Sequence, residues 1–86
     1  MSERKQWPSV GRDVHYVARG SADGRFPPVC RAAKVTEVNM ADSRLVGLCV
    51  INPTGLFFHP LDGNPGGCWQ DEEGHEGGTW HWPERV

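Results

Sequence analysis

Residues 30–59, CRAAKVTEVNMADSRLVGLCVINPTGLFFH, hold the clearest structural pattern in this chain of 86 residues. Two apolar runs at 31–38 and 45–51 are joined by the polar segment 39–43, and the turn at 52–55 (NPTG) leads into a third run at 56–58. Proline fixes φ at the second position of that turn, asparagine can cap the first, and glycine tolerates the exit geometry. Short runs rich in Val, Ile, Leu and Phe between turn residues predict a three-stranded antiparallel meander.

Two more strands are predicted, one on each side of the meander. The first covers 13–18 (DVHYVA), and the last covers 79–84 (TWHWPE), where the proline ends the pairing. Alternate residues of a strand share a face, so Trp80 and Trp82 point to one side and His81 to the other. The alternation in the second strand fails towards its end at 37–38, which predicts a β-bulge.

These elements predict an all-β fold, a small five-stranded SH3-like barrel with long loops, with an OB-like barrel as the alternative. The single domain is expected at 10–86, after a mobile N-terminal segment at 1–9. Loops are predicted at 19–28 (RGSADGRFPP) and at 61–78 (LDGNPGGCWQDEEGHEGG), the second one exposed, acidic and rich in glycine.

The run 45–51 is apolar on both of its faces. One face can fill a barrel interior, but the other then needs a second cover. A domain of this size also buries a modest core and often gains stability by self-association. The sequence therefore predicts a homo-oligomer.

Composition argues against several classes of partner. The formal net charge of −2 at pH 7 disfavours a nucleic-acid polymer, and a membrane partner is not expected. No run of about 18 apolar residues could span a membrane, and 1–10 has no signal-peptide core. The chain has three cysteines, an odd number, and no two of them form a C-x-x-C motif. Both features favour reduced thiols. These features predict a cytoplasmic protein.

No metal, cofactor or catalytic motif is recognisable. Cys68, His75 and His81 have C-x6-H-x5-H spacing, unlike zinc patterns, whose ligand pairs lie two to five residues apart. His15 and His81 could meet if their strands pair, but a site of two histidines is incomplete. No serine lies in a nucleophile elbow, and the acids at 71–73 indicate a solvated loop. The sequence predicts no enzyme and no cofactor.

A resemblance to a known family rests on four segments: 11–17 (GRDVHYV), 31–38 (RAAKVTEV), 46–50 (VGLCV) and the ending 78–84 (GTWHWPE). In this order they resemble a family of small proteins encoded by bacteriophages and prophages, common in actinobacterial ones and mostly without an assigned function. The match covers nearly the whole chain from Val10, and the ending is its most specific part. The resemblance implies a phage origin but no activity.

Aromatic and arginine side chains are the best candidates for a binding site. Rings and guanidinium groups together bind nucleotide-like anions by stacking and charge-assisted hydrogen bonds. The competing interpretation is that two tryptophans on one face of a closing strand belong to the core or an interface. The predicted ligand-binding residues are Arg12, His15, Tyr16, Arg31, Trp80, His81 and Trp82.

The leading hypothesis is a phage-encoded, non-enzymatic oligomer that binds a small anionic, nucleotide-like ligand at its subunit seams. In its most concrete form it is an anti-defence sponge in the host cytoplasm, sequestering a cyclic oligonucleotide or NAD-derived immune signal by stoichiometric binding. The alternative is a phage structural or accessory protein that decorates the virion or docks on another phage protein.

Overall fold

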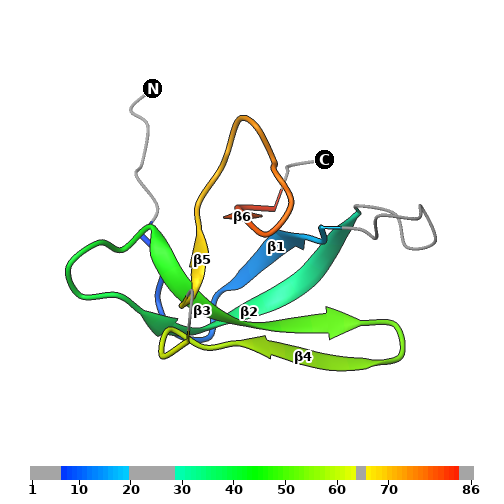
Figure 1. Cartoon of the computed structure of the whole chain (residues 1–86), viewed down its shortest axis with the longest axis horizontal. Coiled ribbons are helices and arrows are strands. Elements are labelled where there is room, and N and C mark those ends of the chain that lie inside the picture. The colour runs from blue at the N-terminus through cyan, green and yellow to red at the C-terminus, as the bar shows by residue number, and fades with distance from the viewer. Residues whose placement is uncertain (1–6, 20–28, 64–65, 84–86) are drawn as a thin grey trace.

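The computed structural model describes residues 7–19, 29–63 and 66–83 (Figure 1). Its strands, in chain order, are β1 (Asp13–Val17), β2 (Cys30–Val38), β3 (Leu45–Asn52), β4 (Gly55–His59), β5 (Cys68–Trp69) and β6 (Trp80–His81). The prediction of an all-β, barrel-like fold is confirmed. Parts of the predicted N-terminal segment (1–6), of both predicted loops (20–28 and 64–65) and of the C-terminal end (84–86) lie outside the described residues.

The predicted meander is present as β2, β3 and β4. In the β3–β4 register Asn52 lies opposite Gly55, so Pro53 and Thr54 form the tight connection that the sequence indicated. The β2–β3 register shifts just before Glu37, which confirms the predicted bulge. The described part of the chain contains no helix that is long and apolar enough to cross a membrane.

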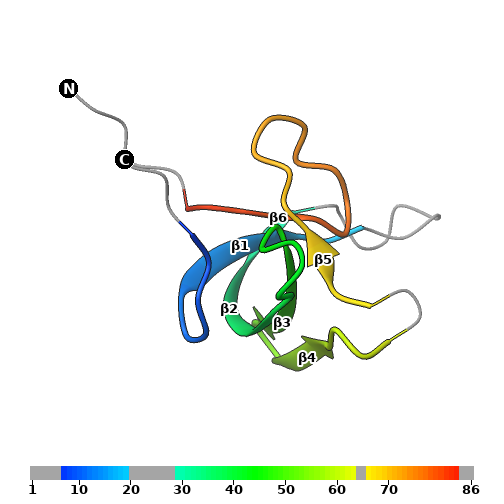
Figure 2. The ribbon, with the colours of Figure 1, turned by 90° about the vertical axis from the view of Figure 1, so that its left-hand side faces the viewer.

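The barrel is closed by β5, a strand that the sequence did not predict. The sheet order is β4-β3-β2-β1-β6. β5 pairs with Leu45 and Val46 at the start of β3, on the same edge of β3 that pairs with β4 from Leu48 onward. Gln70, directly after β5, forms a parallel bridge to Trp80 of β6. The strands β3-β2-β1-β6-β5 thus form a ring, with β1 and β2 curving around it, while the β3–β4 hairpin extends beyond (Figures 1 and 2).

Two sequence predictions are corrected by this closure. The segment 61–78 is not simply an exposed loop, because Cys68 is 3% exposed and pairs with Val46. The last strand is shorter than predicted, with only 80–81 in the sheet. The Trp82 N–H donates to the Glu72 carboxylate at 2.9 Å instead of to a neighbouring strand, so pairing ends before the proline.

The core lies on the concave face of the sheet. It consists of Val14, Tyr16, Ala33, Val35, Val46, Leu48, Val50, Cys68 and Trp80. The indole N–H of Trp80 donates to the Arg44 carbonyl at 3.0 Å, which satisfies the one polar group of that ring. Alternation on β1 sends Tyr16 into this core and its neighbour His15 to the convex face.

The convex face of the β3–β4 hairpin carries exposed apolar side chains, here called the outer patch: Ile51, Leu56 and Phe58. Ile51 lies directly opposite Leu56, and Phe58 lies opposite Cys49, so all of them share one face. Leu56 and Phe58 are each 61% exposed and Ile51 is 41% exposed. The second face of β3 is thus not covered by the described part of the chain.

Candidate functional site

A pocket of about 540 Å³ opens where the β3–β4 hairpin leaves the barrel. The residues around it that carry rings, charge or hydrogen-bonding groups are Tyr16, Arg19, Asn52, Phe57, His59 and Cys68. The Tyr16 and His59 ring centroids lie 4.8 Å apart and those of His59 and Phe57 4.9 Å apart. One wall of the pocket is therefore a continuous row of three rings.

The local fold explains why these rings meet. Phe57 and His59 alternate on β4 and lie opposite Val50 and Leu48 of β3, so they share the concave face of the sheet. Tyr16 reaches the same face from β1. The β4 strand thus extends the core face beyond the closed ring, where its side chains line a pocket instead of packing in the core.

Arg19 supplies the positive charge of the pocket. It lies two residues after the end of β1, and its charge and a side-chain hydrogen bond act to lower the pKa of the Tyr16 hydroxyl. Gly78 lies against it with φ of 88°, and a Cβ at that position would fall 2.5 Å from the Arg19 Nε. Only glycine combines this backbone conformation with so close an approach, so Gly78 helps to position Arg19.

Burial sets the protonation of the other pocket groups. It raises the pKa of Tyr16 above 10.0 and that of the Cys68 thiol to about 11. Burial, together with the Arg19 charge, lowers the pKa of His59 below 6.5. At neutral pH these three groups are uncharged, while Arg19 is cationic, and no acidic residue is among the described pocket-lining residues. The pocket is suited to an anion that carries a ring.

Of the predicted ligand-binding residues, Tyr16 alone is among those described as lining this pocket. Arg31 lies opposite Tyr16 in the β1–β2 register. Arg12 places its guanidinium 5.1 Å from the centroid of the Trp82 ring, in a separate cation–π contact. The predicted set is therefore divided over different parts of the barrel.

The prediction that Trp80 and His81 present rings to a ligand needs correction. Both side chains are 0% exposed. Trp80 fills the core, because β6 is the strand that closes the ring, and the Trp82 ring packs edge-on against it with centroids 5.3 Å apart. Of the two tryptophans, Trp80 and Trp82, only Trp82 retains accessible surface, and it is half-buried.

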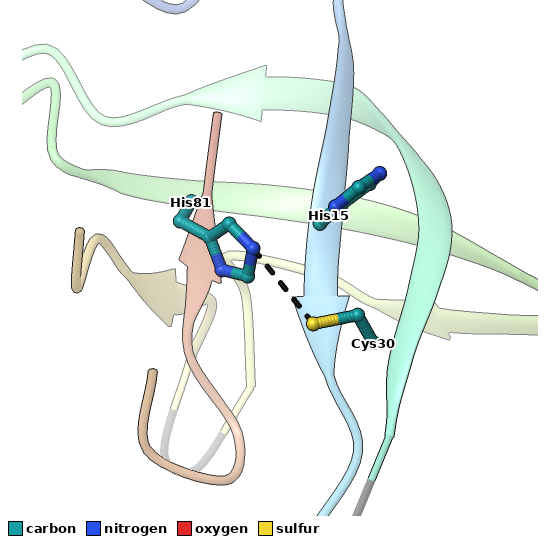
Figure 3. A group of neighbouring side chains, drawn as sticks. All are labelled: His15, Cys30 and His81. Carbon is teal, nitrogen blue, oxygen red and sulfur yellow. Dashed lines mark hydrogen bonds between the residues drawn. The ribbon is translucent and has the colours of Figure 1, made fainter. Parts of the chain in front are cut away.

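His15 and His81 do meet, as their strands pair directly. They are opposite each other in the β1–β6 register, with ring centroids 5.4 Å apart. Cys30, the first residue of β2, joins them, and its Sγ lies 3.8 Å from the His81 Nε2 (Figure 3). One ligand-type atom from each of the three residues lies within 4.8 Å of the others. The sequence argument missed Cys30.

Some of the missed residues had a signal in the sequence. The turn at 52–55 fixes the β3–β4 register, and this register places Phe57 and His59 on the concave face. Cys30 lies opposite Val17, and therefore diagonally from His15 on one face, but this requires the β1–β2 register, which no short turn fixes. Arg19 had no such signal, because its position depends on contact with Gly78, which is distant in sequence.

No protein-family model matches the chain, and no curated protein or solved structure is significantly similar to it.

Proposed function

We propose that this protein is a phage-encoded, non-enzymatic binding protein whose pocket takes up a small anionic ligand with an aromatic ring, in its most concrete form a nucleotide immune signal. The observation that carries the proposal is the row of rings formed by Tyr16, His59 and Phe57 beside the Arg19 guanidinium. Stacking holds a base, and a charge-assisted hydrogen bond holds a phosphate. The phage origin rests on the family resemblance alone.

The size and location of the pocket fit a small molecule. A volume of about 540 Å³ lies within the range of about 300–1,000 Å³ typical of small-molecule sites. The pocket lies within one chain, whereas the sequence hypothesis placed the ligand at subunit seams. A binding site complete in one subunit gives one ligand for each chain, the stoichiometry that a sponge in the host cytoplasm needs.

The protonation of the pocket favours binding over catalysis. A nucleophilic cysteine needs a lowered pKa, but burial raises that of Cys68 to about 11. Tyr16 is likewise shifted towards its protonated form. A protonated thiol and phenol donate hydrogen bonds and do not attack a bound ligand. We therefore propose sequestration without turnover.

The test is isothermal titration calorimetry of the purified chain with cyclic di- and trinucleotides and ADP-ribose, together with native mass spectrometry of protein from cells whose nucleotide-based immunity is active. We expect one probe to bind stoichiometrically. Arg19→Ala should weaken binding about 10- to 150-fold, because a hydrogen bond to a charged group contributes about 1.5–3 kcal/mol.

The matched control is Arg44→Ala. Arg44 is exposed, is paired with Asp42 at 2.7 Å and is not among the pocket-lining residues, so its loss removes the same charge without touching the pocket. The proposal fails if no probe binds at high micromolar concentration, or if Arg19→Ala and Arg44→Ala weaken binding equally.

The outer patch favours a second candidate function, a structural or accessory protein of the virion. Exposed neighbouring apolar side chains on an edge hairpin are typical of an interaction surface. The same patch would also form the homo-oligomer that the sequence predicts. Burying the exposed part of Phe58, on the order of 120 Å², would contribute about 3 kcal/mol to either interface.

Light scattering coupled to size exclusion, compared between wild type and Phe58→Asp, separates these uses. An oligomer that Phe58→Asp converts to monomers supports self-association. A monomeric wild type that is found in purified particles supports the virion role instead. If the wild type is monomeric and absent from particles, the outer patch has neither function.

A further inference from the structure

The histidine–cysteine cluster lies on the face of β1 opposite the pocket. His15 and Tyr16 are adjacent in β1 and therefore point to opposite faces. His15 comes from β1, Cys30 from β2 and His81 from β6, so three separate strands contribute one side chain each. Figure 3 shows the Cys30 sulfur and a ring nitrogen of His81 facing each other across β1, with His15 beside them.

The distances between the three side chains are close to those of a metal site. Zinc binds histidine nitrogen at about 2.0–2.1 Å and cysteine sulfur at about 2.3 Å in tetrahedral geometry, so two such ligand atoms lie roughly 3.3–3.6 Å apart. The Cys30 Sγ and His81 Nε2 are 3.8 Å apart, and all three ligand atoms lie within 4.8 Å of one another. Contraction by up to roughly 1.5 Å, within the reach of side-chain rotation, would complete three ligand positions.

The surroundings combine a rigid part with an accessible one. His81 is fully buried, and the ring of His75 stacks on it with centroids 3.7 Å apart and an interplanar angle of 8°. Two backbone N–H groups around His75, those of Gly74 and Glu76, donate to the Asp71 carboxylate at 2.8 and 3.1 Å and fix this turn. Cys30 is exposed, so an ion can reach the cluster from solvent.

We propose that His15, Cys30 and His81 form a binding site for a borderline-soft transition-metal cation of the zinc class. One thiolate and two imidazoles suit zinc and exclude calcium and magnesium, which require oxygen ligands. Three protein ligands leave the fourth position of a tetrahedral ion open to water or a further ligand. The sequence alone predicted no metal, because it paired only the two histidines.

The ion would cross-link three strands of the barrel. β6 has only two residues in the sheet, and its pairing with β1 covers only the His15–His81 and Tyr16–Trp80 positions. A metal bound at this point ties β6 to β1 and to the start of β2. Small domains with limited cores commonly gain stability in this way.

The test is titration of the full, chelator-treated chain with Co²⁺ and Zn²⁺. Co²⁺ in place of zinc reports thiolate ligation through a sulfur-to-metal charge-transfer band and a four-coordinate site through intense visible bands. We expect one ion per chain, both spectral features, displacement of Co²⁺ by Zn²⁺, and a melting temperature that rises with Zn²⁺ concentration.

The decisive variants are Cys30→Ser and His15→Gln. Cys30→Ser should remove the charge-transfer band, and each variant should weaken binding at least about tenfold. Cys49→Ser is the matched control, because Cys49 is also a free, partly exposed thiol but lies opposite Phe58, outside the cluster. Circular dichroism of the metal-free variants checks that they still fold.

Any one of three outcomes would overturn the proposal. These are the absence of a charge-transfer band in the wild type, binding of Co²⁺ by Cys30→Ser as tight as that of the wild type, and loss of the band in Cys49→Ser. In the first case the contact between Cys30 and His81 is a weak hydrogen bond only. Because the cluster and the pocket are separate, none of these outcomes depends on nucleotide binding.

Discussion

Replacing Gly78 by alanine is expected to disturb the pocket by displacing Arg19. The glycine has φ of 88°, and an added Cβ would lie 2.5 Å from the Arg19 Nε and 2.8 Å from one of its terminal nitrogens. The far end of a long side chain can move out of the way, so the domain should still fold. Arg19 would then leave the Tyr16 hydroxyl that its guanidinium contacts.

The expected loss of unfolding free energy in Gly78→Ala has two contributions, one from the backbone and one from the lost hydrogen bond. Holding an alanine in the left-handed region costs roughly 1–2 kcal/mol, and losing the Tyr16–Arg19 hydrogen bond costs about 1 kcal/mol. The sum, about 2–3 kcal/mol of unfolding free energy, corresponds to a fall in melting temperature of roughly 8–24 °C for a domain of this size.

Alanine substitutions at two other glycines distinguish the backbone contribution from the hydrogen-bond contribution. Gly11 has φ of 92° but no heavy atom within 4 Å of an added Cβ, so Gly11→Ala should lose only the backbone part. Gly55 also has open space and lacks a positive φ, so Gly55→Ala should be close to neutral or slightly stabilising. Urea unfolding of the three variants measures each part in turn.

The pocket itself is monitored through Tyr16, which is the single tyrosine of the chain. The charge and hydrogen bond of Arg19 lower the pKa of this phenol, in opposition to burial. Its absorbance titration should therefore shift to higher pH in Gly78→Ala and in Arg19→Ala, but not in Gly11→Ala. An unchanged Tyr16 titration in Gly78→Ala would refute the contact between Gly78 and Arg19.

Two further predictions concern the core. Burial raises the pKa of Cys68 to about 11 from an ordinary 9.0, so its contribution to stability is complete below pH 9 and is lost as pH rises from 9 to 11, at most about 3 kcal/mol. Urea unfolding across that range should show a flatter decline for Cys68→Ala, and an equal decline would contradict this source of alkaline instability. Trp80→Phe should destabilise the domain by about 1.5–3 kcal/mol in chemical denaturation, from lost volume and the lost hydrogen bond to Arg44. The Arg44 carbonyl keeps the Gln70 N–H as a donor, so a larger loss would imply rearrangement beyond the Trp80 site.

The pocket and the histidine–cysteine cluster use the two sides of one strand. Tyr16 lines the pocket and its neighbour His15 belongs to the cluster, because successive residues of β1 point to opposite faces. A ligand and a metal ion would therefore bind without competing for space. An ion that fixes β6 against β1 would also hold the strand from which Tyr16 enters the pocket.

The sequence by itself determined the features that depend on neighbouring residues. The meander, its turn at 52–55 and the bulge before Glu37 were predictable because turn chemistry and alternation act over two to five residues. The two faces of β1 followed from the same alternation. The exposed second face of β3 could also be anticipated, since both of its faces are apolar.

The tertiary structure alone decided which residues form the sites. β5 has only two residues in a glycine-rich acidic segment, and it becomes a strand because its Cys68 pairs with Val46, which is distant in sequence. Alternation placed Trp80 and His81 on opposite faces but could not show that both are buried, because burial depends on what covers each face. Arg19 and Cys30 reach their sites through register and closure, which are set by pairing across the whole sheet and leave no local trace in the sequence.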